Sequence, residues 1–135
     1  MKLRIKDNSV RVRLDRRDLD RLIELGRVES VVRFGPTSQC AFSYAVELRS
    51  VSNQHPTVDY YSGRLLLAIG REDANQWYNS ELVGFEHEQT VDGGVVRVLL
   101  EKDFACVDRP AGEESDDAWA FPNPAAVCSS GAAIR

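Results

Sequence analysis

Positively charged side chains alternate with apolar ones at the start of the chain. Residues two apart on a strand lie on one face of a sheet, so these cations line up on one side. Clustered guanidinium and ammonium groups bind phosphate or carboxylate when they are partly enclosed. The pattern predicts a site for a small anionic ligand or, alternatively, a solvated outer face whose charges pair with neighbouring acids. The cations are Lys2, Arg4, Lys6, Arg11 and Arg13.

A second polar cluster follows a run of apolar residues late in the chain. Glu101 and Asp103 are two residues apart, so on a strand they share one side while Lys102 faces the other. Two carboxylates on one side can bind a cation or perform acid–base chemistry. Cys106 is a candidate nucleophile, although a free cysteine is more often a small buried apolar residue. These four residues are the catalytic candidates, and we expect the two carboxylates to face a common polar space with some of the cations.

The chain offers few ligands for a metal. His55 and His87 are its two histidines, and its three cysteines have no CxxC spacing, which disfavours a zinc site and a disulfide framework. Glu86 and Glu88 share one face of a predicted strand, and such a pair binds divalent metals in some barrels. We expect no metal site, and these two would be the candidates if one were present; the sequence indicates no particular cofactor.

Composition excludes several classes of protein. The chain has 135 residues and a net charge of −4, which disfavours nucleic acid as a partner because phosphate neutralisation needs surplus lysine and arginine. No segment approaches the roughly 20 apolar residues of a membrane helix, and the start lacks the apolar core of a signal peptide. We therefore expect a cytoplasmic protein without a membrane partner.

Turn residues and periodicity predict the elements that position these side chains. Period-two alternation is interrupted by Asp7-Asn8, Ser62-Gly63 and Asp92-Gly93, each of which suits a hairpin turn. Asp15 and Gly26 suit the two ends of a helix. The expected elements are hairpins over 2–6 and 9–14, 58–61 and 64–69, and 83–89 and 95–101, helices over 16–25 and 71–79, and strands over 28–34, 41–48 and 103–107.

The order hairpin, helix, two strands is expected twice. Aligning Asp7 with Ser62 and Asp15 with Gly70 gives one offset of 55 residues, which suggests an internal ββαββ duplication. The predicted fold class is α+β, with a strongly curved, barrel-like antiparallel sheet of about eight strands and two short helices. The alternative is one ordinary curved sheet with both helices packed on it.

The end of the chain changes in composition. We expect residues 1–124 to form a single domain and residues 125–135 a flexible tail. Trp119 and Phe121 are predicted to be mostly buried against the sheet, because aromatic rings bury large apolar areas. The acidic residues within 113–117 are expected to lie over the basic hairpin.

Several segments together resemble a widespread bacterial family of small stand-alone proteins. They are KLRIKDNSVRVRL at the start, Phe34-Gly35, Trp77 ahead of Val83-Gly84, LLEKDFACV at 99–107 and FPNP at 121–124. The family's hallmark is close to VEKDFxCL, followed by an acidic stretch and FPNP. The resemblance implies one domain that includes both late motifs, but no activity, because the family is one of unknown function.

Three functions remain open at this point. The leading hypothesis is a small domain that binds an anionic ligand at the basic hairpin, facing the acidic strand end. The alternatives are a small enzyme that uses Glu101, Lys102, Asp103 and Cys106, and a protein-interaction module. Enclosure separates them, because a pocket around Arg11, Arg13 and Glu101 favours ligand binding or catalysis, whereas a filled barrel with outward-facing cations favours protein interaction or a solvated face. The sequence does not specify the ligand or the oligomeric state.

Overall fold

The computed structural model describes residues 1–50, 55–105, 119–122 and 124, and they form an α+β fold. The order of two strands, a helix and two strands occurs twice, as the sequence predicts. The first set comprises β1 (Lys2–Lys6), β2 (Ser9–Leu14), α1 (Arg16–Leu25), β3 (Arg27–Arg33), a 3₁₀ turn (Ser38–Cys40) and β4 (Ala41–Arg49). The second comprises β5 (Thr57–Tyr61), β6 (Arg64–Gly70), α2 (Arg71–Tyr78), β7 (Gly84–Val91) and β8 (Gly94–Lys102).

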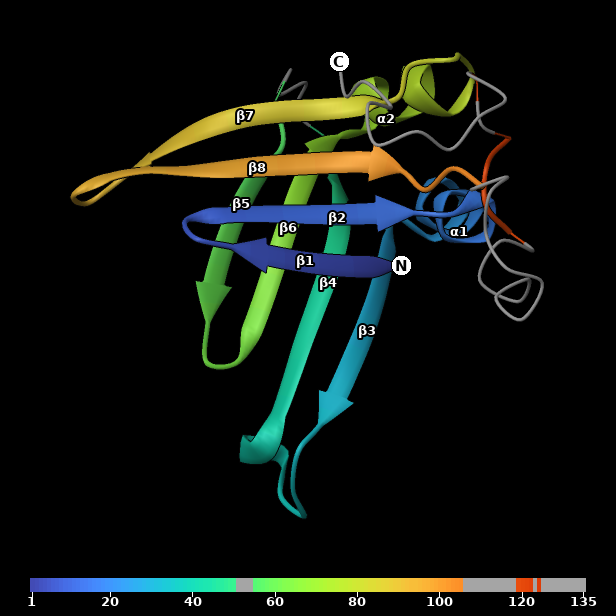
Figure 1. Cartoon of the computed structure of the whole chain (residues 1–135). Helices are drawn as coiled ribbons and strands as arrows, with labels where there is room; N and C mark the ends of the chain where they lie inside the picture. Colours follow the sequence, from blue (N-terminus) through green and yellow to red (C-terminus); the bar gives the residue numbers. More distant parts are fainter. Residues whose placement is uncertain (51–54, 106–118, 123, 125–135) are drawn as a thin grey trace.

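The strands form two four-stranded sheets, in the orders β1-β2-β8-β7 and β3-β4-β6-β5. Each sheet combines a strand pair from the first ββαββ set with a pair from the second. The two pairs meet through parallel contacts, β2 with β8 and β4 with β6. In Figure 1 the strands of one sheet cross those of the other, and both helices lie toward one end of the molecule.

This arrangement corrects the predicted barrel and the predicted all-antiparallel sheet. The described strands form two mixed sheets and no closed barrel. The physical reason is that alternation specifies which face of a strand is buried but not which strand lies beside it. Each helix carries the chain from one sheet into the other, so the sheets face each other in two layers.

The three predicted hairpins are confirmed, because all three pairs are antiparallel about the expected turns. Asp7 and Ser62, the first turn residues of two of them, have φ of 49° and 48°. Gly93 has φ of 83° in the third. These left-handed conformations match the right-handed twist of paired strands, which is why short polar residues and glycine occur there.

Both predicted helices are present, and they bury equivalent faces. In α1, Asp15 and Asp18 form a reciprocal capping box, and Gly26 ends the helix with φ of 80°. Leu19 and Leu22 of α1 are fully buried, as are the residues 55 positions later in α2, Ala74 and Trp77. The offset derived from the turns therefore also relates the buried positions of the helices.

The core lies between the two sheets and beneath the helices. It is built from the inward-facing residues of the central strands, of which Leu14, Leu67 and Leu100 have no exposed surface. Burying each such side chain contributes about 1.5–3 kcal/mol. Because every second residue of β2 and β8 enters this core, the alternate residues face outward on the other side of the first sheet.

The segment after β8 follows the expectations only in part. In place of a continued strand, Phe104 forms a single parallel bridge with Phe121. Phe121 is partly buried against the core, whereas Trp119 is 49% exposed, so the predicted burial of Trp119 is wrong. The guanidinium of Arg17 lies 5.4 Å from the Trp119 ring centroid, and this cation–π contact holds the ring at the surface. Residues 113–117 and 125–135, with their predicted contacts and flexibility, lie outside the described residues.

Candidate anion-binding face

Strand register places the predicted cations on one surface. Lys2 lies opposite Arg13, and Arg4 opposite Arg11, with Lys6 opposite Ser9. The intervening residues of β2 enter the core, so these five cations lie on the outer side of the first sheet. We call the surface formed by Lys2, Arg4, Lys6, Arg11 and Arg13 the cationic face.

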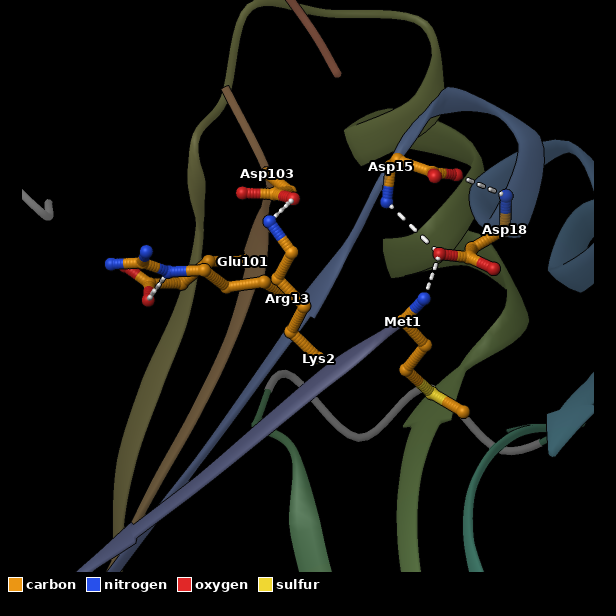
Figure 2. Close-up of polar contacts among 7 residues, drawn as sticks. All are labelled: Met1, Lys2, Arg13, Asp15, Asp18, Glu101 and Asp103. Atoms are coloured by element: carbon orange, nitrogen blue, oxygen red, sulfur yellow. Dashed lines mark hydrogen bonds and ion pairs between the residues drawn. The ribbon is translucent and has the colours of Figure 1, made fainter. Parts of the chain in front are cut away.

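The predicted carboxylates adjoin this face. The Nζ of Lys2 lies 3.0 Å from the Oδ2 of Asp103 (Figure 2). The Nε of Arg11 lies 3.0 Å, and that of Arg13 3.7 Å, from the Oε1 of Glu101. The expected proximity is present, but parallel pairing of β2 with β8 produces it, not the closure of a barrel.

Positive charge is in excess on the cationic face. Three of its five cations pair with two carboxylates, Glu101 and Asp103. Farther along the same side of the sheet, β7 adds Glu86 and Glu88, and β8 adds Arg97, which pairs with Glu86. Within the described parts of the chain, neither Arg4 nor Lys6 has a carboxylate within 4.0 Å. An anion that binds beside them therefore has two cations for which it does not compete with a described acid.

Glu101 is a buried carboxylate whose hydrogen-bonding capacity is incompletely used. Its side chain is 3% exposed, and its Oε1 accepts no hydrogen bond even though it lies 3.0 Å from the Nε of Arg11. The contact is therefore an ion pair with poor donor alignment. Burial raises the pKa of Glu101 above its ordinary value, while the charges of Arg11 and Arg13 act in the opposite direction.

Gly84 of β7 makes this site compact, a role that was not predicted from the sequence. Gly84 pairs with Glu101, and a Cβ built on it would lie 2.2 Å from the backbone oxygen of Leu100. Only glycine permits this close approach of β7 to β8. A glycine at the start of a strand was the available signal, since such residues often mark close contact of two backbones.

Lys102 lies on the opposite side of β8, as strand alternation predicts. Its Nζ donates a hydrogen bond to the carbonyl oxygen of Ser80 at 2.7 Å and lies 5.1 Å from the ring centroid of Phe121. Burial lowers the pKa of Lys102, and nearby Glu81 partly offsets this. The catalytic candidates therefore do not converge, because Lys102 faces away from Glu101 and Asp103. Cys106 lies outside the described residues.

The start of β1 is held in place by α1. The amino group of Met1 lies 2.6 Å from the Oδ2 of Asp18, which also accepts a hydrogen bond from the backbone of Asp15 (Figure 2). Burial raises the pKa of Asp15 in this cluster. Because Lys2 is the next residue, the cluster positions the first cation of the cationic face.

The metal candidates do not gather into a site. Glu86 binds Arg97, whose Nε donates to its Oε1 at 2.6 Å. Where the structure describes the chain, it contains no group of three residues able to hold a metal ion. His87 stacks on His55 with ring centroids 4.5 Å apart and planes 7° from parallel. Ring nitrogens bind metals in the plane of the ring, so stacked rings do not direct them at a common point.

Two hollows lie away from the cationic face. One, of about 340 Å³, is lined by Arg16, Asp20, Tyr78 and Phe121. The other, of about 210 Å³, lies on the outer side of the second sheet and includes Ser43, Ala45 and Leu66. The lining of neither hollow includes a residue of the cationic face. Neither hollow therefore supplies the pocket around Arg11, Arg13 and Glu101 that would favour an enclosed ligand or a catalytic site.

The comparisons with known proteins identify a family and no activity. The model of a family of unknown function, DUF7009, matches residues 1–125. Neither a curated protein nor a solved structure matches the chain. The match spans the region over which the sequence resemblance extends, while the bacterial distribution and the hallmark motif remain predictions. No helix in the described parts is long and apolar enough to cross a membrane.

Proposed function

The chain belongs to a family of unknown function, and from the geometry of its first sheet we propose that it binds an anionic ligand on the cationic face. The observation that carries the proposal is the register that gathers five cations on one side of the sheet, two of which, Arg4 and Lys6, have no described carboxylate within 4.0 Å. With Arg97, Glu86 and Glu88 included, this side has six cations and four described carboxylates, so an excess of positive charge remains.

The dimensions of the cationic face favour an extended anion. Lys2, Arg4 and Lys6 occupy alternate positions of β1, so they span about 13 Å, and β2 lies about 4.8 Å away. The Debye length at physiological ionic strength is about 8 Å, so neighbouring cations act together on a charge at this surface. A chain of phosphate groups can contact several of them at once, whereas a single small anion reaches two or three.

The enzyme alternative has less support. Glu101 and Asp103 are both engaged with cations of the hairpin, and Lys102 faces the opposite side of β8. An acid–base pair needs a reacting group placed between its members. The carboxylates are better explained as internal partners that fix the arginine and lysine side chains for binding.

A titration calorimetry experiment tests the proposal with inorganic tripolyphosphate as the probe. The variant Arg4→Gln/Lys6→Gln removes two cations without touching the ion pairs of Glu101 or Asp103. Exposed charge pairs contribute about 0.2–1 kcal/mol each, so we expect the loss of two cations to raise the dissociation constant about 2- to 30-fold.

The matched control is Arg27→Gln/Arg64→Gln, which removes the same charge from the outer side of the second sheet. We expect it to bind tripolyphosphate as the unmodified protein does. Circular dichroism and thermal melting verify that both variants fold. Equal weakening in the two variants would mean that only net charge matters, and absence of binding by the unmodified protein would reject the proposal.

A further inference from the structure

We propose that Glu101 is the proton-binding residue of the cationic face, so that anion binding is accompanied by uptake of one proton from solvent. In the free protein the carboxylate is the partner of Arg11 and Arg13. A bound oxyanion becomes the partner of these guanidinium groups, and the buried Glu101, which loses their support, takes up the proton. This inference rests on the proposed function and adds the regulation of that site by pH.

The first argument is the position of the Glu101 carboxyl group. Its side chain is 3% exposed, and its Oε1 lies within 4.0 Å of two arginines but accepts no hydrogen bond. An ionised carboxylate with unused acceptor capacity is poorly stabilised in a buried place. Protonation removes the charge that burial penalises.

The second argument is that Arg11 and Arg13 can contact a ligand and Glu101 together. Their side chains are 22% and 41% exposed, so both reach solvent as well as the buried carboxylate. A guanidinium group has five N–H donors in a planar fork. The ion pairs with Glu101 involve the Nε of each arginine, which leaves the terminal nitrogens for an anion.

The third argument is the set of charges around Glu101. From β2, Arg11 and Arg13 favour its ionised form, while from β7 the charge of Glu86 opposes it. From β1, the amino group of Lys2 is engaged with Asp103 on the same side of the sheet. Gly84, opposite on β7, adds no side chain.

The ionised form of Glu101 thus depends on the two arginines. A polyanion that pairs with these arginines weakens their stabilisation of ionised Glu101 and adds negative charge nearby. Both effects favour the protonated form.

The direction of the pH effect follows from these contacts. Burial already raises the pKa of Glu101, and a bound anion raises it further. Binding therefore tightens as the pH falls through the range between these two pKa values, by at most tenfold per pH unit for one linked proton. The variant Glu101→Gln is neutral at this position at every pH, so it should bind without this proton uptake.

Calorimetry of tripolyphosphate binding in buffers of different ionisation enthalpy measures the protons taken up per ligand. The experiment compares the unmodified protein, Glu101→Gln and Glu47→Gln over roughly pH 5–8. Glu47 is the matched control, because it lies on the outer side of the second sheet and pairs with Arg27. Protonation of tripolyphosphate itself contributes equally to the proton uptake measured with each of the three proteins, so the difference in proton uptake between them reports on Glu101.

We expect the unmodified protein and Glu47→Gln to take up more protons than Glu101→Gln, with a difference that approaches one proton per ligand. We also expect Glu101→Gln to bind more tightly than the unmodified protein at the upper end of the range. Equal proton uptake in all three proteins, with binding retained, would overturn the role of Glu101 and leave the proposed function standing. Absence of binding in all three would reject both.

Discussion

Replacing Gly84 by alanine tests how β7 and β8 are held together beside Glu101. The Cβ of the variant would lie 2.2 Å from the backbone oxygen of Leu100 and 2.7 Å from the Cα of Glu101. Contacts below 3.0 Å essentially never occur for real Cβ atoms, so the first distance must grow by at least 0.8 Å, which is 3.0 minus 2.2. Both contacts are with backbone, so the strands themselves must separate.

The cost follows from the hydrogen bonds at this point. The carbonyl oxygen of Val83 accepts from the backbone nitrogen of Lys102 at 2.9 Å and from the indole nitrogen of Trp77 at 3.2 Å. A shift of this size stretches the bond between Lys102 and Val83 beyond hydrogen-bonding distance, and with it the neighbouring bonds of the β7–β8 ladder. Two or three lost bonds at about 0.5–1.5 kcal/mol each, with overpacking strain added, give about 2–4 kcal/mol of destabilisation. For a chain of this length that lowers Tm by roughly 10 °C.

Thermal and urea denaturation monitored by circular dichroism measure this loss. The control is Gly93→Ala, which has φ of 83° and open space around its Cβ, so it incurs only backbone strain of about 1 kcal/mol. We expect Gly84→Ala to lose at least twice as much stability as Gly93→Ala. A Tm of Gly84→Ala within about 2 °C of that of the unmodified protein would refute the close approach of β7 and β8.

Three further outcomes can be measured in the same way. Phe121→Ala should lower the free energy of unfolding by about 2–3 kcal/mol, because Phe121 packs on the core and on Phe104. Trp119→Ala should lower it by less than about 1 kcal/mol, because Trp119 is exposed. Equal losses in the two variants would contradict this. The folded-state pKa of Glu101 is raised, so its stabilising contribution is complete below about pH 4.5 and is lost as the pH rises through the raised pKa. As the pH rises from about 5 to 8, the free energy of unfolding of Glu101→Gln should therefore fall less than that of the unmodified protein. Parallel curves of unfolding free energy against pH for the two proteins would contradict this. Deletion of residues 125–135 should leave Tm unchanged, and a clear drop would show that this segment contributes to the fold.

Local chemistry was enough to predict the elements of this fold. Short polar residues and glycine marked the three hairpin turns, and Asp15 with Gly26 marked the ends of α1. These features act over a few residues, so the sequence displays them directly. The same holds for the cationic face, because alternation along β1 and β2 places its five cations on one side.

Long-range pairing could not be predicted in the same way. Val10 of β2 lies beside Val98 of β8, and Val46 of β4 beside Leu67 of β6, yet many apolar strands offer equivalent inner faces. Alternation specifies the buried face, while the choice of neighbour depends on packing across the whole molecule. The parallel pairings that divide the strands into two mixed sheets leave no pattern within a few residues, so a single barrel was predicted instead. Burial of Trp119 was predicted from its apolar area, without the surface contact that Arg17 makes with the ring.

The most direct test of anion binding is a titration of the ¹⁵N-labelled protein with tripolyphosphate, followed by amide chemical shifts. We predict saturable shifts concentrated in β1 and β2, and in β8 near Glu101, with little change in β3 to β6 of the second sheet. Shifts centred on the second sheet, or no saturable shifts at all, would contradict the assignment of the cationic face as the binding site.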